Sequence, residues 1–277
     1  MDNFQVAAAS AADMLRIAEC AAAEGWNPGD GDADSFFPAD PRGFLVGRLD
    51  GKPITSISAI RYGPDFGFIG LYITRPELRG QGYGLRTWQA GMRRLAGRNV
   101  ALDGVVAQQD NYRRSGFVSA WNNIRYQGLP GIERDRTVTL TDARTLGFDD
   151  LAAYDRRFFP AERDAFLAGW IAQPGHRCLA AVRDGRLAGL GVRRPSREAY
   201  RIGPLYADGP EVAAALLTAL ADDDQVVLDV PDANPAAVEL AERCGLKPLF
   251  ETARMYTGGI PDIDRAGMFA VTTLELG

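Results

Sequence analysis

A pattern of strands, turns and a helix occurs twice along this chain, about 130 residues apart, and this repeat restricts the fold more than any other feature. In each copy an Asp-Gly pair joins two strand-like runs, Asp50-Gly51 in the first copy and Asp184-Gly185 in the second. Asp-Gly in that setting is a strong hairpin signal. Solenoid repeats have shorter periods, of about 20 to 50 residues. The repeat therefore predicts two copies of one α/β fold; the alternative is a chance similarity between unrelated α/β elements.

Hydrophobic periodicity and turn residues predict the elements of the first half. Ser10 is a suitable N-cap for a helix that ends at Ala23. Residues 26–42 contain three prolines and two glycines, so we expect a long loop with at most one helical turn, at 35–37. The other expected helices are 83–96 and 108–115, and the expected strands are 3–9, 43–49, 54–62, 67–74, 100–105 and a strand pair within 117–127.

A linker between the two halves is indicated by Gly128, Pro130 and Gly131, which precede a charged run at 133–136. We therefore expect one domain at 1–130 and a second at 136–277. In the second domain, the expected strands are 137–140, 178–182, 187–193, 201–206 and 227–229, and the expected helix is 210–221.

Composition and charge exclude several classes of protein. The chain has 277 residues, 46% of them hydrophobic, which is enough to build a sizeable core. Its net charge of -5 provides no attraction for nucleic acid or for an anionic membrane, so we expect neither as a partner. The N-terminal stretch lacks the basic region of a signal peptide, and the longest helical apolar run, 212–220, is too short to span a membrane. These features predict a cytoplasmic protein.

The cysteines and the single histidine argue against disulfide and metal chemistry. Cys20, Cys178 and Cys244 are far apart and form no CxxC pair, which indicates a reducing compartment and no zinc site. His176 is the only histidine, so no multi-histidine metal site can form. Because it follows Pro174 and Gly175, we expect it in a surface loop. No metal cofactor is expected.

The segment Arg79–Gly84 has glycine at alternate positions, after a predicted strand and before a predicted helix. Glycine permits positive φ, so successive N–H groups can turn inward and form an anion-binding nest. The helix start at Tyr83 adds its own free N–H groups and positive dipole end. We predict a pyrophosphate site that needs no metal; an ordinary glycine-rich turn is the alternative.

Two other nucleotide motifs fit this segment less well. A Walker A loop requires Gly-Lys-Ser or Gly-Lys-Thr, which is absent from it. The dinucleotide fingerprint requires a third glycine where Leu85 stands, although Asp103 occupies the position of the acidic residue that contacts the ribose. A dinucleotide-binding oxidoreductase is therefore retained as an alternative.

The segment Tyr72–Gly84, including Pro76-Glu77, resembles the acetyl-CoA motif of the GNAT superfamily of N-acetyltransferases. Asn111–Phe117 is similar to the closing helix of that family, with a tyrosine before Gly-Phe. Gly25–Gly29 and Asn123–Tyr126 are similar to a two-domain bacterial subgroup with a diverged second half. The resemblance covers residues 1–127 in element order. It implies tandem GNAT-like α/β (α+β) domains, each with a mixed, mostly antiparallel central sheet flanked by helices.

The resemblance implies a direct attack of an amine on the thioester of acetyl-CoA, with a backbone N–H of the splayed strand stabilising the oxyanion. Tyr112 would protonate the departing thiolate; the alternative is that Tyr112 is only a core aromatic residue. The strand edge would pair with pantetheine and the glycine turn would hold the pyrophosphate. The implied coenzyme-binding residues are Leu71, Tyr72, Ile73, Thr74, Arg79, Gly80, Gln81, Gly82, Tyr83 and Gly84.

The general base and the acceptor are less well defined. The strand at 67–74 has no glutamate, the nearest acid is Asp65, and Glu77 is expected to cap its turn. Water or the equilibrium of the free amine can serve instead. Carboxylates alternate with aromatic residues in the 26–42 loop, a combination that suits a cationic amine, although a solvated acidic loop is the alternative. The candidate acceptor residues are Trp26, Asp30, Asp32, Asp34, Phe36 and Phe37.

The second half is not expected to bind coenzyme A. Its counterpart of the glycine turn, Tyr206–Glu211, has one glycine and added carboxylates that repel phosphate, and Ala241 stands where Tyr112 has its counterpart. We expect this half to wall the acceptor pocket. The sequence thus predicts an acetyl-CoA-dependent N-acetyltransferase for a small-molecule or peptide amine, with one active half, as a monomer or homodimer. An acyl-CoA-binding sensor or interaction module without turnover is the alternative.

Overall fold

A computed structural model describes residues 2–133 and 135–277. The strands of the first half are β1 (Phe4–Ala8), β2 (Phe44–Leu49), β3 (Lys52–Tyr62), β4 (Phe66–Thr74), β5 (Asn99–Val105) and β6 (Val118–Gly128). Its helices are α1 (Ala11–Ala23), α2 (Asp32–Phe36), α3 (Tyr83–Arg94) and α4 (Gln109–Arg114).

The second half repeats this order of elements, as its recurring sequence pattern predicted. Its strands are β7 (Leu140–Asp142), β8 (Arg177–Arg183), β9 (Arg186–Arg194), β10 (Tyr200–Ala207), β11 (Val226–Pro231), β12 (Lys247–Tyr256) and β13 (Met268–Ala270). Its helices are α5 (Phe148–Asp155), α6 (Asp164–Ala172), α7 (Pro210–Ala221) and α8 (Pro235–Arg243). None of the helices within the described ranges is long and apolar enough to cross a membrane.

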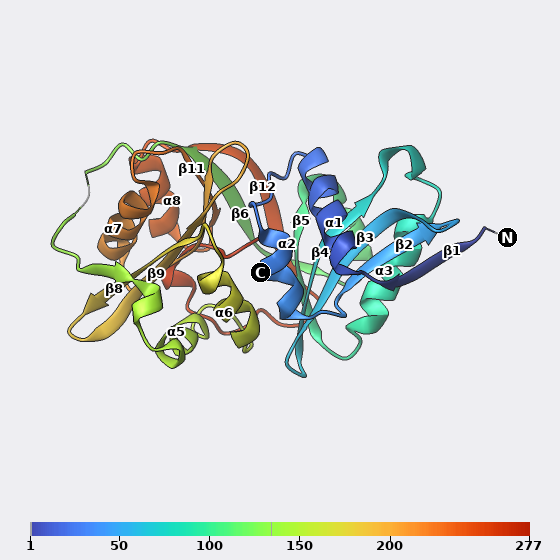
Figure 1. Ribbon diagram of the computed structural model, residues 1–277, viewed down its shortest axis with the longest axis horizontal. Helices are drawn as coiled ribbons and strands as arrows, with labels where there is room; N and C mark the ends of the chain where they lie inside the picture. Colours follow the sequence, from blue (N-terminus) through green and yellow to red (C-terminus); the bar gives the residue numbers. More distant parts are fainter. Residues whose placement is uncertain (1, 134) are drawn as a thin grey trace.

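The two halves share one continuous sheet, with the order β1-β2-β3-β4-β5-β12-β6-β11-β10-β9-β8-β7 and β13 on β10. β12 of the second half lies between β5 and β6 of the first, and β6 in turn pairs with β11. Figure 1 shows β6 and β12 crossing the middle of the molecule. The pairs β4–β5 and β10–β11 are parallel and the other pairs are antiparallel. The predicted α/β (α+β) class, with mixed, mostly antiparallel sheets flanked by helices, is confirmed.

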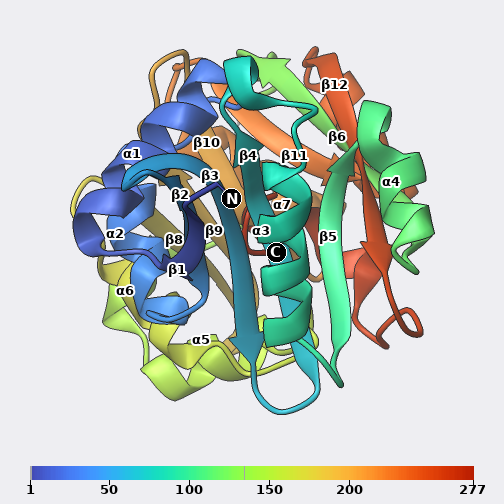
Figure 2. The same cartoon turned by 90° about the vertical axis from the view of Figure 1, so that its right-hand side faces the viewer.

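The helices cover both faces of this sheet. Figure 2, which looks at the first half from its end, shows α3 in front of β4 and β5, while α1 and α2 lie on the other side. α1 begins where the sequence predicted: Ser10 Oγ accepts the Asp13 N–H (3.2 Å), and the Asp13 carboxylate accepts the Ser10 N–H (2.9 Å). Arg48 of β2 donates to that carboxylate and so fixes the start of the helix on the sheet.

Three predicted elements were wrong in detail. A strand pair was expected within 117–127, but residues 118–128 form the single strand β6, and both edges of β6 are occupied by strands of the second half. The 26–42 loop contains α2 and a further 3-10 turn, because α2 packs against α6, where the Phe36 and Trp170 rings stack with centroids 6.1 Å apart. The strand expected at 137–140 begins only at Leu140, where pairing with β8 starts.

The expectation that His176 lies in a surface loop was also wrong. Its side chain is 5% exposed, because the ring packs edge-on against Trp170 with centroids 4.8 Å apart. Its Nδ1 lies 2.7 Å from the Trp170 carbonyl oxygen, so that nitrogen donates a hydrogen bond. Burial, and after it the charge of Arg194, lowers the His176 pKa to about 4. The ring is therefore a neutral part of the core.

Candidate active site

The site is built where β4 and β5 separate. Their parallel pairing runs from Phe66 opposite Asn99 to Ile69 opposite Leu102 and ends there. Immediately afterwards β4 has a bulge: Leu71 has φ 48, and the register with β3 shifts between Ser56 and Ser58. The Ser56 hydroxyl donates to the Leu71 carbonyl oxygen (2.9 Å) and so holds the bulge in place. The rest of β4 is thereby turned away from β5.

A cavity of about 340 Å³ lies beside α1, and one of about 530 Å³ fills the opening between β4 and β5. Eight of the ten coenzyme-binding residues predicted from the sequence line the larger cavity. Gln81 and Tyr83 are outside it: the Gln81 amide points back to the Glu77 carbonyl oxygen, and the Tyr83 ring packs on Phe4. The eight that line the cavity are Leu71, Tyr72, Ile73, Thr74, Arg79, Gly80, Gly82 and Gly84.

The glycine turn has the geometry of an anion cradle. Gly80 and Gly82 have φ of 75° and 86°, and a Cβ added at either would meet no atom within 4 Å, so their outer face is open. Gly82 is the N-cap of α3, and no side chain among the described residues caps the free N–H groups there. These donors fit a pyrophosphate, which helix N-termini bind through N–H groups and the dipole. Gly84 is needed for a different reason, since its Cβ would lie 2.7 Å from Thr74 Oγ1.

Arg79 links the cradle to α1. Its Nε donates to the Thr74 carbonyl oxygen (3.0 Å), and its guanidinium pairs with Glu24, the residue after α1. Glu24 also lines the cavity. The ion pair therefore joins the glycine turn to the end of α1 at the cavity wall.

The position of Tyr112 is compatible with both interpretations that the sequence left open. Its ring packs against Trp88 (centroids 5.5 Å apart) and Phe117 (6.4 Å), and it also lines the cavity. The ring lies on β5, since a Cβ at Gly104 would come within 2.7 Å of it. Burial, and after it the neighbouring Tyr72, raises the pKa of Tyr112 to about 12. The hydroxyl is therefore protonated at neutral pH and can donate a proton.

Only Trp26 of the candidate acceptor residues lines the cavity. Asp32 is buried, accepts the Gly29 N–H (2.7 Å) and pairs with Arg194 of β9 (2.8 Å). Asp30 and Asp34 are exposed to solvent. Phe36 stacks on Trp170 and Phe37 packs on Phe44. Asp32 and Phe36 thus attach this segment of the first half to the second half.

Other parts of the cavity wall contain residues that sequence reasoning missed. Phe250 and Thr252 come from β12, and Leu274 and Glu275 come from the end of the chain. Arg125 of β6 also lines the cavity; its guanidinium donates to Asp229 (2.7 and 2.9 Å) and to the Trp26 carbonyl oxygen (2.9 Å). The four residues from β12 and the end of the chain reach the site through strand exchange and long-range contacts, which leave no local signal in the sequence.

Asp103 lines the same cavity, but it is fully engaged in an ion pair. Arg254 of β12 donates to both of its carboxylate oxygens (2.7 and 2.8 Å), and the Asn123 amide donates to one of them (2.7 Å). The ion pair with Arg254 explains why an acidic residue stands near the end of β5, so no contact with a ribose is needed to explain it. The resemblance of Asp103 to the acidic residue of a dinucleotide site is therefore superficial.

The comparison with known sequences identifies the family. The sequence model of the acetyltransferase (GNAT) family matches residues 11–117, and that of an acetyltransferase (GNAT) domain matches residues 151–270. The chain is 31% identical to a holothin acyltransferase of a Pseudoalteromonas strain over 274 residues, covering 97% of this chain and 93% of the relative. The chain belongs to the GNAT acetyltransferase family. It is also 24% identical, over 76% of both chains, to a Bacillus subtilis protein named as an uncharacterized N-acetyltransferase.

Solved structures share the tandem GNAT fold. A candidate acetyltransferase from Pyrococcus horikoshii superposes with a TM-score of 0.83 at 20% identity, covering 99% of this chain and 96% of that one. A tandem GNAT protein of the clavulanic acid biosynthesis pathway gives a TM-score of 0.61 at 13% identity, covering 93% and 100%. The prediction that the chain is a GNAT protein with two tandem domains is thus confirmed.

In the second GNAT domain the corresponding opening is filled by the chain itself. β10 and β11 pair in parallel only from Tyr200 to Ile202, and β13 then pairs with the remainder of β10. The Val271 N–H donates to the Asp229 carbonyl oxygen (3.0 Å). A Cβ at Gly203 would lie 2.4 Å from the Thr272 carbonyl oxygen, so the segment is packed directly against β10.

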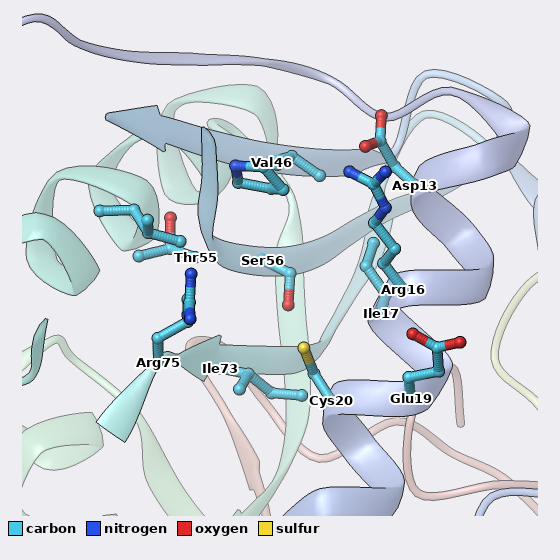
Figure 3. Close-up of a pocket in the computed structure, with 12 residues that line it drawn as sticks. Asp13, Arg16, Ile17, Glu19, Cys20, Val46, Thr55, Ser56, Ile73 and Arg75 are labelled. Atoms are coloured by element: carbon cyan, nitrogen blue, oxygen red, sulfur yellow. The ribbon is translucent and has the colours of Figure 1, made fainter. Parts of the chain in front are cut away.

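The smaller cavity of about 340 Å³ lies on the α1 side of the sheet in the first GNAT domain. Figure 3 shows Cys20 of α1 and Ser56 of β3 pointing toward one another across it, with Arg75 at its rim. Ile73 of β4 lines both this cavity and the larger one. The two cavities therefore have this residue in common in their walls.

Proposed function

We propose that this GNAT protein transfers an acetyl group from acetyl-CoA to a primary amine by direct attack, with one active site in each chain, in the first domain. The observation that carries the proposal is the cavity between β4 and β5. It has an open glycine cradle at one end and a protonated tyrosine in its wall.

The chain's own residues supply what such a transfer requires. The N–H groups of the cradle and of the first turn of α3 hold the pyrophosphate of the donor, and the edge of β4 at 71–74 pairs with its pantetheine arm. The bulge at Leu71 turns β4 away from β5, so backbone N–H groups of this strand face the thioester carbonyl and stabilise the oxyanion. No metal is needed for these interactions.

Tyr112 is the proposed acid for the departing thiolate. The amine nitrogen forms a bond to the thioester carbon, the carbon–sulfur bond breaks, and the sulfur takes the phenolic proton. The Tyr112 pKa of about 12 keeps that proton on the oxygen until the thiolate forms. Its contacts with Trp88 and Phe117 fix the ring, so the donor is held in position.

A single active domain is supported by β13. In the second domain, the segment from Met268 to Thr272 occupies the space between β10 and β11 that remains open between β4 and β5. α7 begins with Pro210 after a single glycine, Gly209, and Pro has no N–H to donate. This domain therefore acts as the wall of the acceptor side, through β12 and the residues that follow β13.

The test measures release of free thiol from acetyl-CoA with a panel of cationic amines, amino acids and peptides. The panel includes holothin because a relative is named for it. Propionyl-CoA and a longer acyl-CoA serve as competing donors. Turnover fastest with acetyl-CoA supports the proposal. Binding of coenzyme without turnover on any amine would instead indicate an acyl-CoA sensor.

A further inference from the structure

Three residues with carboxylate side chains line the larger cavity, between β4 and β5, and they differ in their hydrogen-bond and ion-pair partners. Glu24 is paired with Arg79, and both oxygens of Asp103 accept hydrogen bonds from Arg254. Glu275 is 5% exposed, and its Oε2 has no hydrogen-bond partner within the part of the chain that the structure describes. A buried polar atom without a partner is costly and is uncommon in native proteins. The lack of a hydrogen-bond partner for Glu275 Oε2 among the described residues therefore requires an explanation.

The backbone of Glu275 is fixed beside the bulge of β4. The Ser58 hydroxyl of β3 donates to its carbonyl oxygen (3.2 Å), and the Tyr62 hydroxyl donates to the carbonyl oxygen of the next residue, Leu276 (3.1 Å). The Leu276 N–H donates to Thr273 Oγ1 (3.0 Å). Gly70 directly precedes the bulge, and its lack of a side chain permits the contact. Glu275 thus lines the cavity next to β4, the strand proposed to hold the thioester.

We propose that Glu275 is the general base of the transfer, accepting the proton that the amine nitrogen loses as it acylates. This inference rests on the function proposed above. The bonds and protons balance: the nitrogen–carbon bond forms, the carbon–sulfur bond breaks, Glu275 gains the proton from nitrogen and the sulfur gains the proton of Tyr112. Glu275 then gives its proton to water and the Tyr112 phenolate takes one from water, which restores both groups. An acceptor that arrives as an ammonium ion first loses one further proton to water.

The charges around Glu275 suit this role. Burial, the largest effect, raises its pKa above the usual range for glutamate, and Asp32 of α2 raises it further. Arg201 of β10, Arg125 of β6 and Arg194 of β9 act in the opposite direction and favour the ionised form. A carboxylate with a raised pKa takes a proton more readily than an ordinary carboxylate.

The same segment gives the second domain a role in the site of the first. From Met268 to Thr272 it fills the opening of its own domain, and three residues later it delivers Glu275 to the opening of the other. β4 carries no glutamate, so the first domain lacks an acid of its own on that strand. The domain without a coenzyme site thereby completes the one that has it.

The test compares wild type with Glu275→Gln, which keeps the shape and removes the basicity. Glu251→Gln is the matched control, because Glu251 lies on β12 between two cavity residues but is itself exposed. With the best amine of the panel, we expect kcat for Glu275→Gln to fall by about 10²-fold or more. In wild type, kcat/KM should fall at low pH as Glu275 becomes protonated. This acid limb of the pH profile should be absent from Glu275→Gln. Coenzyme affinity, measured by calorimetry, should be unchanged, and Glu251→Gln should match wild type.

Three results would overturn the inference. One is an unchanged kcat and pH profile for Glu275→Gln, and another is a raised KM with unchanged kcat, which would make Glu275 a site for the cationic amine. If Glu275→Gln fails to bind coenzyme, Glu275→Asp decides: retention of the acid limb supports a carboxylate base, and its loss refutes it. A wild-type protein that turns over no amine instead contradicts the proposed function itself.

Discussion

The carbonyl oxygen of Glu275 lies 2.1 Å from the position that a Cβ at Gly70 would occupy. No real Cβ tolerates such a contact with a backbone atom, so the end of the chain and β4 fit together only because residue 70 is glycine. The contact joins the second domain to the strand beside which the proposed transfer takes place. A substitution at Gly70 can therefore displace Glu275 while the side chain of Glu275 stays the same.

Gly70→Ala should displace the segment that contains Glu275. We expect a loss of about 1–3 kcal/mol in the free energy of unfolding, because an added methyl group overpacks the contact. We expect a fall of at least ~10-fold in kcat, since small misplacements of a reacting group are costly. Urea unfolding and steady-state kinetics provide the two measurements.

Gly169→Ala in α6 is the matched control for that variant. A Cβ there meets no atom within 4 Å, and the residue is helical, so alanine should leave stability unchanged or raise it by about 1 kcal/mol. If Gly70→Ala behaves like Gly169→Ala in both measurements, the contact with Glu275 has no role in holding the site.

Alanine at Gly80 or Gly82 should weaken coenzyme binding through the cradle. Each substitution forces positive φ on a residue with a side chain, at a cost of about 1–2 kcal/mol, and places a methyl group on the open face. We expect the Kd for coenzyme A, measured by calorimetry, to rise by about 10-fold or more.

Gly97→Ala separates strain from loss of the cradle. Gly97 has φ of 83° and no atom within 4 Å of an added Cβ, but it lies outside the cavity. This variant should lose a similar amount of stability and keep the wild-type Kd. An equal loss of affinity in the two kinds of variant would mean that the cradle does not contact the coenzyme.

Tyr112→Phe removes the proposed acid and keeps the packing of the ring on Trp88. We expect kcat to fall by about 10²–10³-fold with little change in Kd for coenzyme A, because general acids contribute factors of this size. Since the Tyr112 pKa is about 12, the wild-type profile should show no basic limb from this residue near neutral pH. Tyr200→Phe in the second domain is the control. Wild-type kcat in Tyr112→Phe would leave Tyr112 with a packing role alone.

Local chemistry made much of the fold predictable. The Asp50-Gly51 and Asp184-Gly185 hairpins, the cap of α1 at Ser10 and the bounds of α7 depend on residues that are close in sequence, and each was predicted correctly. The positive φ of Gly80 and Gly82 was predictable in the same way, whereas binding of a pyrophosphate by this turn stays a prediction.

Long-range pairing was beyond prediction. Ser58 and Glu275 are 217 residues apart, and no local pattern indicates that they meet. Asp32 was expected to face the acceptor amine, with a solvated acidic loop as the alternative, because its partner, Arg194, lies 162 residues away. β6 was expected to pair with a neighbour in sequence, whereas β12 takes that place. In each case the deciding partner comes from the other domain.

His176 should make stability depend on pH. Its pKa is about 4 in the folded chain and near 6.5 when unfolded, so the unfolded state binds the proton first as the pH falls. The stabilisation from the neutral ring is complete above about pH 6.5 and is lost as the pH falls toward 4. At about 1.4 kcal/mol for each pKa unit, we expect a loss of roughly 3 kcal/mol in the free energy of unfolding.

His176→Gln isolates this effect, because glutamine does not titrate and can still donate to the Trp170 carbonyl oxygen. The variant should be less stable than wild type at neutral pH, since it loses the edge-on contact with the Trp170 ring. Its stability should fall less steeply between pH 6.5 and 4, because the carboxylates common to both proteins contribute equally. Urea unfolding of both proteins across that range provides the comparison. Parallel curves would show that His176 keeps an ordinary pKa in the fold and that its ring is open to protonation.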